Sequence, residues 1–416
     1  MSVTYPLGFK VAAGTAGLKP SGKSDLMLIV RDPSAASAFA AVFTANQIVG
    51  APITIGREQR FKHLRGQLRT PRAILVNAGN SNAATGEKGI ADARACMEAV
   101  AGLVKCAGEE VVVSSTGIIG RPLPVDKILA KLSELAGSLA RGDDADASAA
   151  AAIMTTDLVP KAARREIATG EGKVRIGAVA KGSGMVAPRL DSPAHAPTPS
   201  ATMLAFITTD ASIGSRDLQL LLEDACSGSF NRISVDNHPS CSDMVVCLAS
   251  GKSGVRVEKG TAEWTAFADA FIDLCRELSE LVVTDGEGAT RVFRVSVKGA
   301  ASDTDAERIA REVVNSPLVK CAIHGRDPNW GRIVTAAGNA GVRFDPSITS
   351  LAIGSVEVYH AGIPVVAALG DPRLAEAMAG KRVECLLTVG SGPGSSWMLG
   401  CDLSKDYVAI NADYTT

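Results

Sequence analysis

The sequence predicts an α/β or α+β fold built from packed layers. Short apolar runs that end in turn-forming residues alternate with longer segments of helical periodicity, which is typical of strands and helices in layers. The composition agrees, because 46% of residues are hydrophobic and only 4% are aromatic. A chain of 416 residues is long enough for two or three domains with a substantial core.

Short apolar runs predict the strands. Each is a few residues long, rich in Val, Ile, Leu or Ala, and bounded by glycine, asparagine, serine or threonine. The last run reaches the final residue, where a strand frays unless it is docked. The predicted strands are Leu26–Val30, Ala38–Thr44, Ala73–Val76, Val111–Val113, Lys173–Val179, Met203–Thr208, Val292–Lys298 and the terminal run Tyr407–Thr416.

Longer segments with apolar residues three and four positions apart predict amphipathic helices. The clearest has Trp264, Phe267, Phe271 and Leu274 on one face, and another stops before Pro317. The predicted helices are Asp92–Val104, Asp143–Met154, Asp217–Cys226, Trp264–Leu281 and Ala306–Val314.

Two polar turns follow predicted strands. Asn77–Asn82 holds three asparagines beside Gly79, which indicates a turn with left-handed backbone, although the same amides could face a substrate. Ser114–Gly117 places small hydroxyl residues and glycine just beyond a strand, where α/β proteins often bind anions. Such a turn can also simply end the strand, so the residues alone leave both interpretations open.

The central stretch Lys181–Pro188 is rich in glycine and is followed by a Pro-rich segment and then Ala201-Thr202. Cleavage before Thr202 would give that residue a free α-amine beside its hydroxyl. A nucleophile and its base would then belong to one residue. The alternative is a plain loop between two strands.

Charge and cysteine content exclude several classes of function. A formal net charge of −1, with no basic block, disfavours partners such as nucleic acid or an anionic membrane. Nine scattered cysteines without a Cys-x-x-Cys pair disfavour a disulfide framework and a metal site, and indicate a reducing, cytoplasmic location. We identify no signal peptide, membrane span, or phosphate-binding motif of the Walker or Rossmann type.

Nine motifs, in order along nearly the whole chain, carry a resemblance to a known family. They are Gly17–Gly22, Val42–Thr44, Asn77–Ala83, Ser115–Gly120, Ile153–Asp157, Lys181–Met185, Ala201–Leu204, Arg326–Arg332 and Asn411–Thr416. With these motifs the chain resembles the ornithine acetyltransferases, also called glutamate N-acetyltransferases, of arginine biosynthesis.

The resemblance implies a precursor that cleaves itself between Ala201 and Thr202. Residues 1–201 would form an α chain, 202–282 would complete the catalytic core, and 283–416 would form a smaller C-terminal α/β domain. The family fold is a layered α-β-β-α sandwich, and the two chains would assemble as α2β2.

The resemblance also assigns roles to residues. Thr202 would be the nucleophile that accepts the acetyl group of N-acetylornithine and passes it to glutamate, with its own amine as general base. Thr116 and Gly117 match the oxyanion hole. The substrate-binding positions are Thr155, Lys181, Thr202, Glu287, Asn411 and Thr416. The family chemistry requires no cofactor or metal, and acetyl-CoA is a further candidate donor.

The chain departs from the family pattern at three places. Residues 189–200 lengthen the segment before the cleavage site by about ten residues, although longer loops cost little, roughly 0.6 kcal/mol per doubling. In the run Asp236–Asp243 we expect Asp243 to keep a structural role. His324 replaces an aromatic residue, and we expect it to pack against Trp330 rather than act as a base.

Two other functions compete with acetyl transfer. An N-terminal nucleophile amidohydrolase or aminopeptidase would use the same residues with water as the acceptor. An unprocessed, non-catalytic paralogue would use the fold for assembly alone.

Overall fold

The computed structural model describes residues 2–191 and 203–413, which form two compact units. The first unit holds the chain up to Asn231 together with His238–Val282, and the second holds Arg232–Asn237 and the residues from Val283 onward. Each unit contains its own sheets and its own buried core.

The first unit contains two sheets. One has the order β1-β2-β4-β5, from Phe9–Gly14, Leu26–Arg31, Ala73–Asn80 and Val111–Ile118. The other has the order β3-β10-β8-β7-β6, from Ala38–Phe43, Met244–Ala249, Leu204–Thr209, Gly172–Lys181 and Lys161–Thr169. Pairing is antiparallel except between β4 and β5 and between β8 and β10.

The two sheets pack face to face and bury one continuous core. Met27 and Val76 of the first sheet share this cluster with Phe206 and Val246 of the second. Successive strand residues point to opposite faces, so a strand with both faces covered is apolar throughout. All six residues of β2, β3, β8 and β10 are buried, and their sequences are apolar except for Arg31 at the end of β2 and Thr208 and Thr209 at the end of β8.

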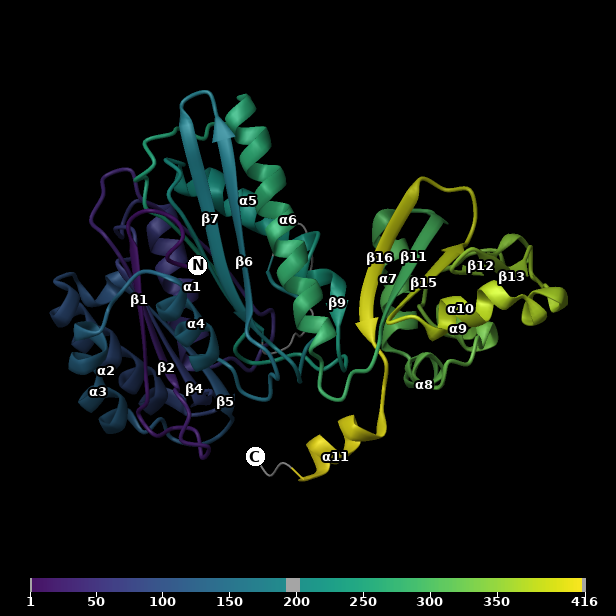
Figure 1. Ribbon diagram of the computed structural model, residues 1–416, viewed down its shortest axis with the longest axis horizontal. Coiled ribbons are helices and arrows are strands. Elements are labelled where there is room, and N and C mark those ends of the chain that lie inside the picture. The colour runs from purple at the N-terminus through teal and green to yellow at the C-terminus, as the bar shows by residue number, and fades with distance from the viewer. Residues whose placement is uncertain (1, 192–202, 414–416) are drawn as a thin grey trace. The chain divides into compact units, whose positions relative to one another are not determined.

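Helices cover the outer face of each sheet (Figure 1). On the first sheet, α2 (Gly86–Val104) and α3 (Val125–Gly137) bury Met97, Val100 and Leu132 against Leu28 and other strand residues. On the second lie α5 (Ser215–Ser227) and the predicted long helix, α6 (Ala262–Thr284). The remaining helices of this unit are α1 (Ala51–Leu64) and α4 (Asp143–Ala152). These layers confirm the α-β-β-α sandwich.

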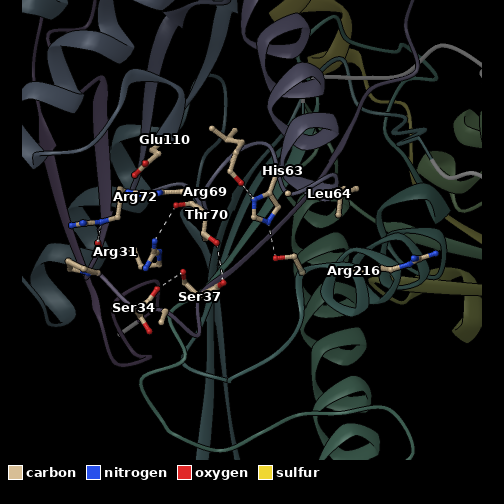
Figure 2. Close-up of a pocket in the computed structure, with 15 residues that line it drawn as sticks. Arg31, Ser34, Ser37, His63, Leu64, Arg69, Thr70, Arg72, Glu110 and Arg216 are labelled. Atoms are coloured by element: carbon tan, nitrogen blue, oxygen red, sulfur yellow. Dashed lines mark hydrogen bonds between the residues drawn. The ribbon is translucent and has the colours of Figure 1, made fainter.

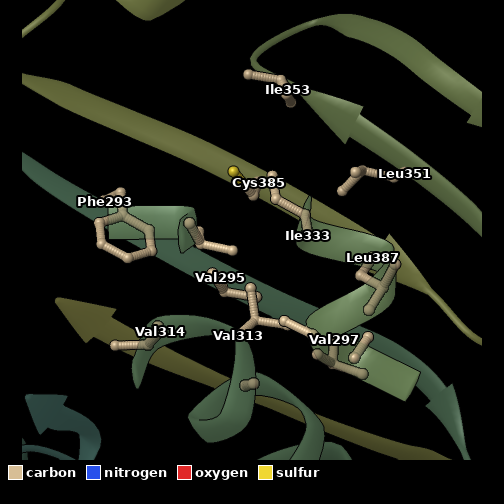
Figure 3. Close-up of a cluster of buried hydrophobic side chains, with 14 of the residues drawn as sticks. Phe293, Val295, Val297, Val313, Val314, Ile333, Leu351, Ile353, Cys385 and Leu387 are labelled. Atoms are coloured by element: carbon tan, nitrogen blue, oxygen red, sulfur yellow. The ribbon is translucent and has the colours of Figure 1, made fainter. Parts of the chain in front are cut away.

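The second unit is built on a single mixed sheet. Its order is β14-β13-β12-β15-β11-β16-β9, from Ile363–Pro364, Val356–His360, Ser350–Ile353, Arg382–Thr388, Val292–Ala300, Gly394–Cys401 and Ile233–Ser234. Helices α7 (Asp303–Asn315), α8 (Pro317–Gly325), α9 (Trp330–Gly338) and α10 (Pro372–Ala379) accompany it. Figure 3 shows its core, in which Val295 and Val297 of β11 face Val313 of α7 and Ile333 of α9.

The C-terminal segment corrects one prediction. Residues Lys405–Asp413 form helix α11 rather than a strand. The alternation of Val408 and Ile410 suggested one buried face, but these side chains are 60% and 38% exposed. The segment has no neighbouring strand in the described part of the chain, so its backbone groups bond within a helix instead.

Candidate active site

The predicted oxyanion residues Thr116 and Gly117 lie within β5, near its carboxyl end, so the prediction that the strand stops at Val113 and a turn follows is wrong. Gly117 pairs with Gly79 of β4, and both have positive φ, +128° and +104°. A Cβ atom on Gly117 would lie 2.4 Å from the Gly79 carbonyl carbon, so only glycine fits. The register is irregular here, since Asn80 pairs with both Thr116 and Ile118. Backbone displaced from a regular ladder in this way can present N–H groups to an anion.

The side chain of Thr116 is suited to donate to that anion. The residue is only 1% exposed, yet its hydroxyl forms no hydrogen bond with any residue that the structure describes. The preceding hydroxyl behaves differently, because Ser115 Oγ donates to Asn77 Oδ1 at 2.6 Å. The Ser115 hydroxyl is therefore used in a structural hydrogen bond, whereas the adjacent Thr116 hydroxyl is available to donate to a ligand.

The asparagines of the neighbouring segment hold the backbone in place. Asn77 Nδ2 donates to the Asn80 carbonyl at 2.8 Å, and Asn80 Oδ1 accepts the N–H of Asn82 at 2.8 Å. Asn82 has a φ of 48° and donates to the Gly89 carbonyl. Asn77–Asn80 belong to strand β4, so the predicted turn is wrong for these residues, while the predicted left-handed backbone is found at Gly79 and Asn82. The amide contacts hold this end of β4 beside Thr116 and Gly117 of β5.

A polar network around the buried Lys181 joins two of the predicted substrate-binding residues. Lys181, at the end of β7, is 2% exposed and donates from Nζ to Thr155 Oγ1 at 2.8 Å. Its Nζ lies 3.7 Å from Asp157 Oδ2, and Asp157 also pairs with Lys161 at 2.8 Å. The N–H groups of Gly182 and Thr155 donate to the same carboxylate at 2.7 and 2.9 Å.

Two lysines, Lys181 and Lys161, lie against the buried carboxylate of Asp157. Burial alone would raise the pKa of Asp157, but the charges of Lys181 and Lys161 hold that pKa well below its usual range. Asp157 is therefore a carboxylate at working pH. The Lys181 ammonium would attract the carboxylate of a ligand, which suits Lys181 to the substrates that the resemblance implies.

Lys19 is a site neighbour that sequence reasoning did not select. Its Nζ donates to the carbonyls of Ser24 and Ala152 at 2.6 and 2.8 Å. Burial lowers the pKa of Lys19 to about 8. The charges of Asp25 and Asp157 oppose this lowering, and the charge of Lys181 adds to it. Its only signal in the sequence was its place inside the Gly17–Gly22 motif.

The lowered pKa of Lys19 predicts a pH-dependent stability. Between pH 8 and pH 10.5 the unfolded chain binds this proton more tightly than the folded chain does, so folding is favoured as pH rises. We expect the free energy of unfolding, relative to a Lys19→Met variant, to increase across that window in urea titrations. A difference that stays flat, or falls, would contradict the assignment.

The segment that follows the predicted cleavage site is anchored at its first described residue, Met203, just before β8. The N–H of Met203 donates to Asp243 Oδ1, and the carbonyl of Asp243 accepts the N–H of Thr44 at 2.9 Å. Asp243 is fully buried, which confirms its structural role. Ala201, Thr202, Thr416 and most of the insert 189–200 lie outside the described residues.

The second unit brings two further predicted residues together. Asn411 Nδ2 of α11 donates to Glu287 Oε2 at 2.9 Å, and Glu287 is 8% exposed. Tyr407 of the same helix lies 3.4 Å from Asp236 through its hydroxyl. Burial, followed by the charges of Asp236 and Glu287, raises the pKa of Tyr407, so negative charge gathers around this segment.

The prediction for His324 is wrong. Its Nδ1 lies 2.7 Å from Asp402 Oδ2, whereas Trp330 stacks on Tyr359 with ring centroids 5.3 Å apart. Asp402 also accepts from the N–H and the hydroxyl of Thr290 and from the N–H of Arg291. A buried carboxylate with three donors therefore orients the imidazole, and aromatic packing does not.

The predicted residues divide between the units. Thr116, Gly117, Thr155 and Lys181 belong to the first, and Glu287 and Asn411 to the second. Within residues 2–191 and 203–413 no three His, Cys, Asp or Glu side chains gather as a metal-binding group. None of the described helices is long and apolar enough to cross a membrane.

Comparisons with known proteins match this arrangement to one family. Residues 10–416 match the ArgJ family. The arginine biosynthesis bifunctional protein ArgJ of Thermosynechococcus vestitus is 42% identical over 435 residues, spanning 100% of this chain and 98% of that protein. The protein of the same name from Rhodopirellula baltica is 41% identical over 100% of this chain and 97% of that protein.

A crystal structure of ornithine acetyltransferase complexed with ornithine from Mycobacterium tuberculosis is also similar. It is 39% identical and covers 46% of this chain and 96% of that chain, with a TM-score of 0.41. The match over residues 10–416 and the full-length relatives decide the assignment. The chain therefore belongs to the ArgJ family, the ornithine acetyltransferases of arginine biosynthesis whose motifs it carries.

Proposed function

We propose that the chain transfers the acetyl group of N2-acetyl-L-ornithine to L-glutamate, after cutting its own backbone between Ala201 and Thr202. The Thr202 hydroxyl attacks the acetyl carbonyl while the α-amine of Thr202 takes up the hydroxyl proton. The C–N bond breaks, the leaving nitrogen takes up a proton, and ornithine departs. The amine of glutamate then attacks acetyl-Thr202, which releases N-acetylglutamate and restores the hydroxyl.

One observation carries the proposal. Lys181 and Thr155, which the family resemblance singled out independently, are in direct contact, with Lys181 buried and Thr155 exposed to solvent. An ammonium group and a hydroxyl held this way can bind the α-carboxylate that both amino-acid substrates share. Full-length relatives at 41–42% identity that are named bifunctional proteins of arginine biosynthesis support the same reaction.

Each developing charge of the reaction has a matching group. The tetrahedral intermediate carries an oxyanion, for which Thr116 and Gly117 are the donors, and one such donor is typically worth about 3 kcal/mol. Glu287 supplies a carboxylate for the side-chain ammonium of ornithine, with Asn411 bonded to one of its oxygens. Thr416 completes the substrate-binding set.

The proposal extends to assembly and co-substrates. Residues 1–201 and 202–416 form the α and β chains of an α2β2 enzyme in the cytoplasm. No cofactor takes part, because the acetyl group travels on Thr202 itself. Acetyl-CoA is a second donor for glutamate acetylation, and incubation of the enzyme with acetyl-CoA and glutamate alone tests this directly.

The deciding experiment separates transfer from hydrolysis. Purified protein is incubated with N-acetylornithine, with and without glutamate, and N-acetylglutamate and acetate are quantified. We expect N-acetylglutamate to form in step with ornithine and little acetate without glutamate. Acetate release at the same rate in both reactions would identify an amidohydrolase instead. Absence of both products, from a chain that stays uncut, would identify a non-catalytic paralogue.

A further inference from the structure

A cavity of about 540 Å³ in the first unit concentrates positive charge (Figure 2). It lies among the loop between β2 and β3, the segment between α1 and β4, and the start of α5. Its lining includes Glu110 and four arginines, Arg31, Arg69, Arg72 and Arg216, although the whole chain has a net charge of −1. Its volume is in the range of small-molecule sites.

This cavity is separate from the acetyl-transfer chemistry. Arg72 immediately precedes β4 and Glu110 immediately precedes β5, whereas Thr116 lies six residues further along the chain than Glu110. At about 3.3 Å per residue the cavity and the oxyanion residues are roughly 20 Å apart, at opposite ends of the same strands.

A buried guanidinium forms the floor of the cavity. Arg31 is 2% exposed and donates to the carbonyls of Pro71, Asp32 and Thr70 at 3.2, 2.7 and 3.3 Å. No described carboxylate lies within ion-pair distance of it. Burial, and then the charge of Arg72, lower the pKa of Arg31 to about 10. The charges of Glu110, which also lines the cavity, and of Asp32 oppose this lowering, but neither carboxylate forms an ion pair with Arg31.

The guanidinium groups of Arg72 and Arg69 have N–H groups available to donate hydrogen bonds to a ligand. Arg72 uses Nε for the Arg31 carbonyl at 2.8 Å, and its two terminal nitrogens have no described partner. Arg69 is exposed, and its side chain bonds to no residue within the described ranges. Figure 2 shows these two side chains near Arg31, whereas Arg216 extends away from them.

Hydroxyl and imidazole groups also line the cavity. Ser34 Oγ accepts the N–H of Ala36 at 3.3 Å, and its proton has no acceptor among described residues. His63 contacts the Leu68 carbonyl and Ser215 Oγ through its two ring nitrogens. Burial lowers the pKa of His63, so the imidazole forms a neutral wall rather than a ligand.

We propose that this cavity binds a small molecule through a phosphate group, held by Arg69 and Arg72 with Ser34 as a third donor. Guanidinium forks match phosphate oxygens in pairs, and two forks plus a hydroxyl supply enough donors for three terminal oxygens. A dianionic phosphate also balances more of the arginine charge than a single carboxylate would. The ligand is therefore distinct from the amino-acid substrates, whose anionic groups are carboxylates.

Calorimetric titration of the full chain with sodium pyrophosphate, at fixed ionic strength, tests the proposal. We expect one pyrophosphate per chain in the wild type, and a dissociation constant raised about tenfold or more in Arg69→Gln. Arg343→Gln is the matched control, because it removes the same charge from an exposed position in the other unit. Its affinity should equal that of the wild type.

Three outcomes would overturn the assignment. One is the absence of heat and of any ³¹P line shift at millimolar pyrophosphate. Another is equal affinity in the wild type and in the double variant Arg69→Gln/Arg72→Gln. The third is tighter binding of succinate than of pyrophosphate. Arg72 also bonds the Arg31 carbonyl, so the single Arg69→Gln variant keeps the test valid if the double variant misfolds.

Discussion

Replacement of Thr202 by alanine is expected to leave one full-length chain and to abolish acetyl transfer. The wild type should migrate on denaturing gels as two fragments of similar length, 1–201 and 202–416. Alanine lacks the hydroxyl that cuts the backbone and later carries the acetyl group, so both activities fail together. Loss of a catalytic nucleophile typically lowers kcat by a factor of about 10⁴ or more.

Thr202→Ser is the matched variant, since it keeps a hydroxyl and, after cleavage, an α-amine. It should still produce two fragments and retain measurable transfer. Mass spectrometry of wild type mixed with N-acetylornithine alone should find one acetyl group on the 202–416 fragment. Two fragments from the alanine variant would place the nucleophile elsewhere, and the proposed mechanism would then fail with it.

The sequence predicted the central strands well because their local and global signals agree. Strands such as Ala38–Phe43 and Met244–Ala249 are covered on both faces, so they are apolar throughout. Helix α1 was not predicted, because Ile53 and Ile55 are spaced like a strand and the rest of the helix is largely polar. Its position depends on contacts with β3 and β5, which no local pattern records.

The candidate site was predictable as a set of residues but not as a network. Motif order singled out Thr155 and Lys181, and the structure joins them at 2.8 Å. Asp157 and Lys161 are four residues apart and pair locally, but the approach of Lys181 to Asp157 joins residues 24 positions apart, which spacing along the chain does not reveal. Lys19 and the arginine-lined cavity were not predicted for the same reason. The contacts of Lys19, and the lining of the cavity, come from segments that are far apart in the sequence.

Thr116 offers the sharpest test of transition-state stabilisation. Thr116→Ala should lower kcat by about 10²- to 10³-fold, the typical cost of one oxyanion-hole donor. Stability should change little, because the hydroxyl has no hydrogen-bond partner among the described residues to lose. Thr116→Ser should restore most of the rate, and the KM for N-acetylornithine should stay within a few-fold of the wild type.

The adjacent hydroxyl is the matched control. Ser115 Oγ donates to Asn77 at 2.6 Å, so Ser115→Ala leaves a buried amide oxygen without that donor and should cost about 1–3 kcal/mol of unfolding free energy. Its kcat should fall much less than that of Thr116→Ala. We therefore expect Ser115→Ala to lower mainly the stability and Thr116→Ala to lower mainly kcat. If Thr116→Ala lost stability while its kcat remained near wild type, Thr116 would be structural, and the oxyanion would require another donor.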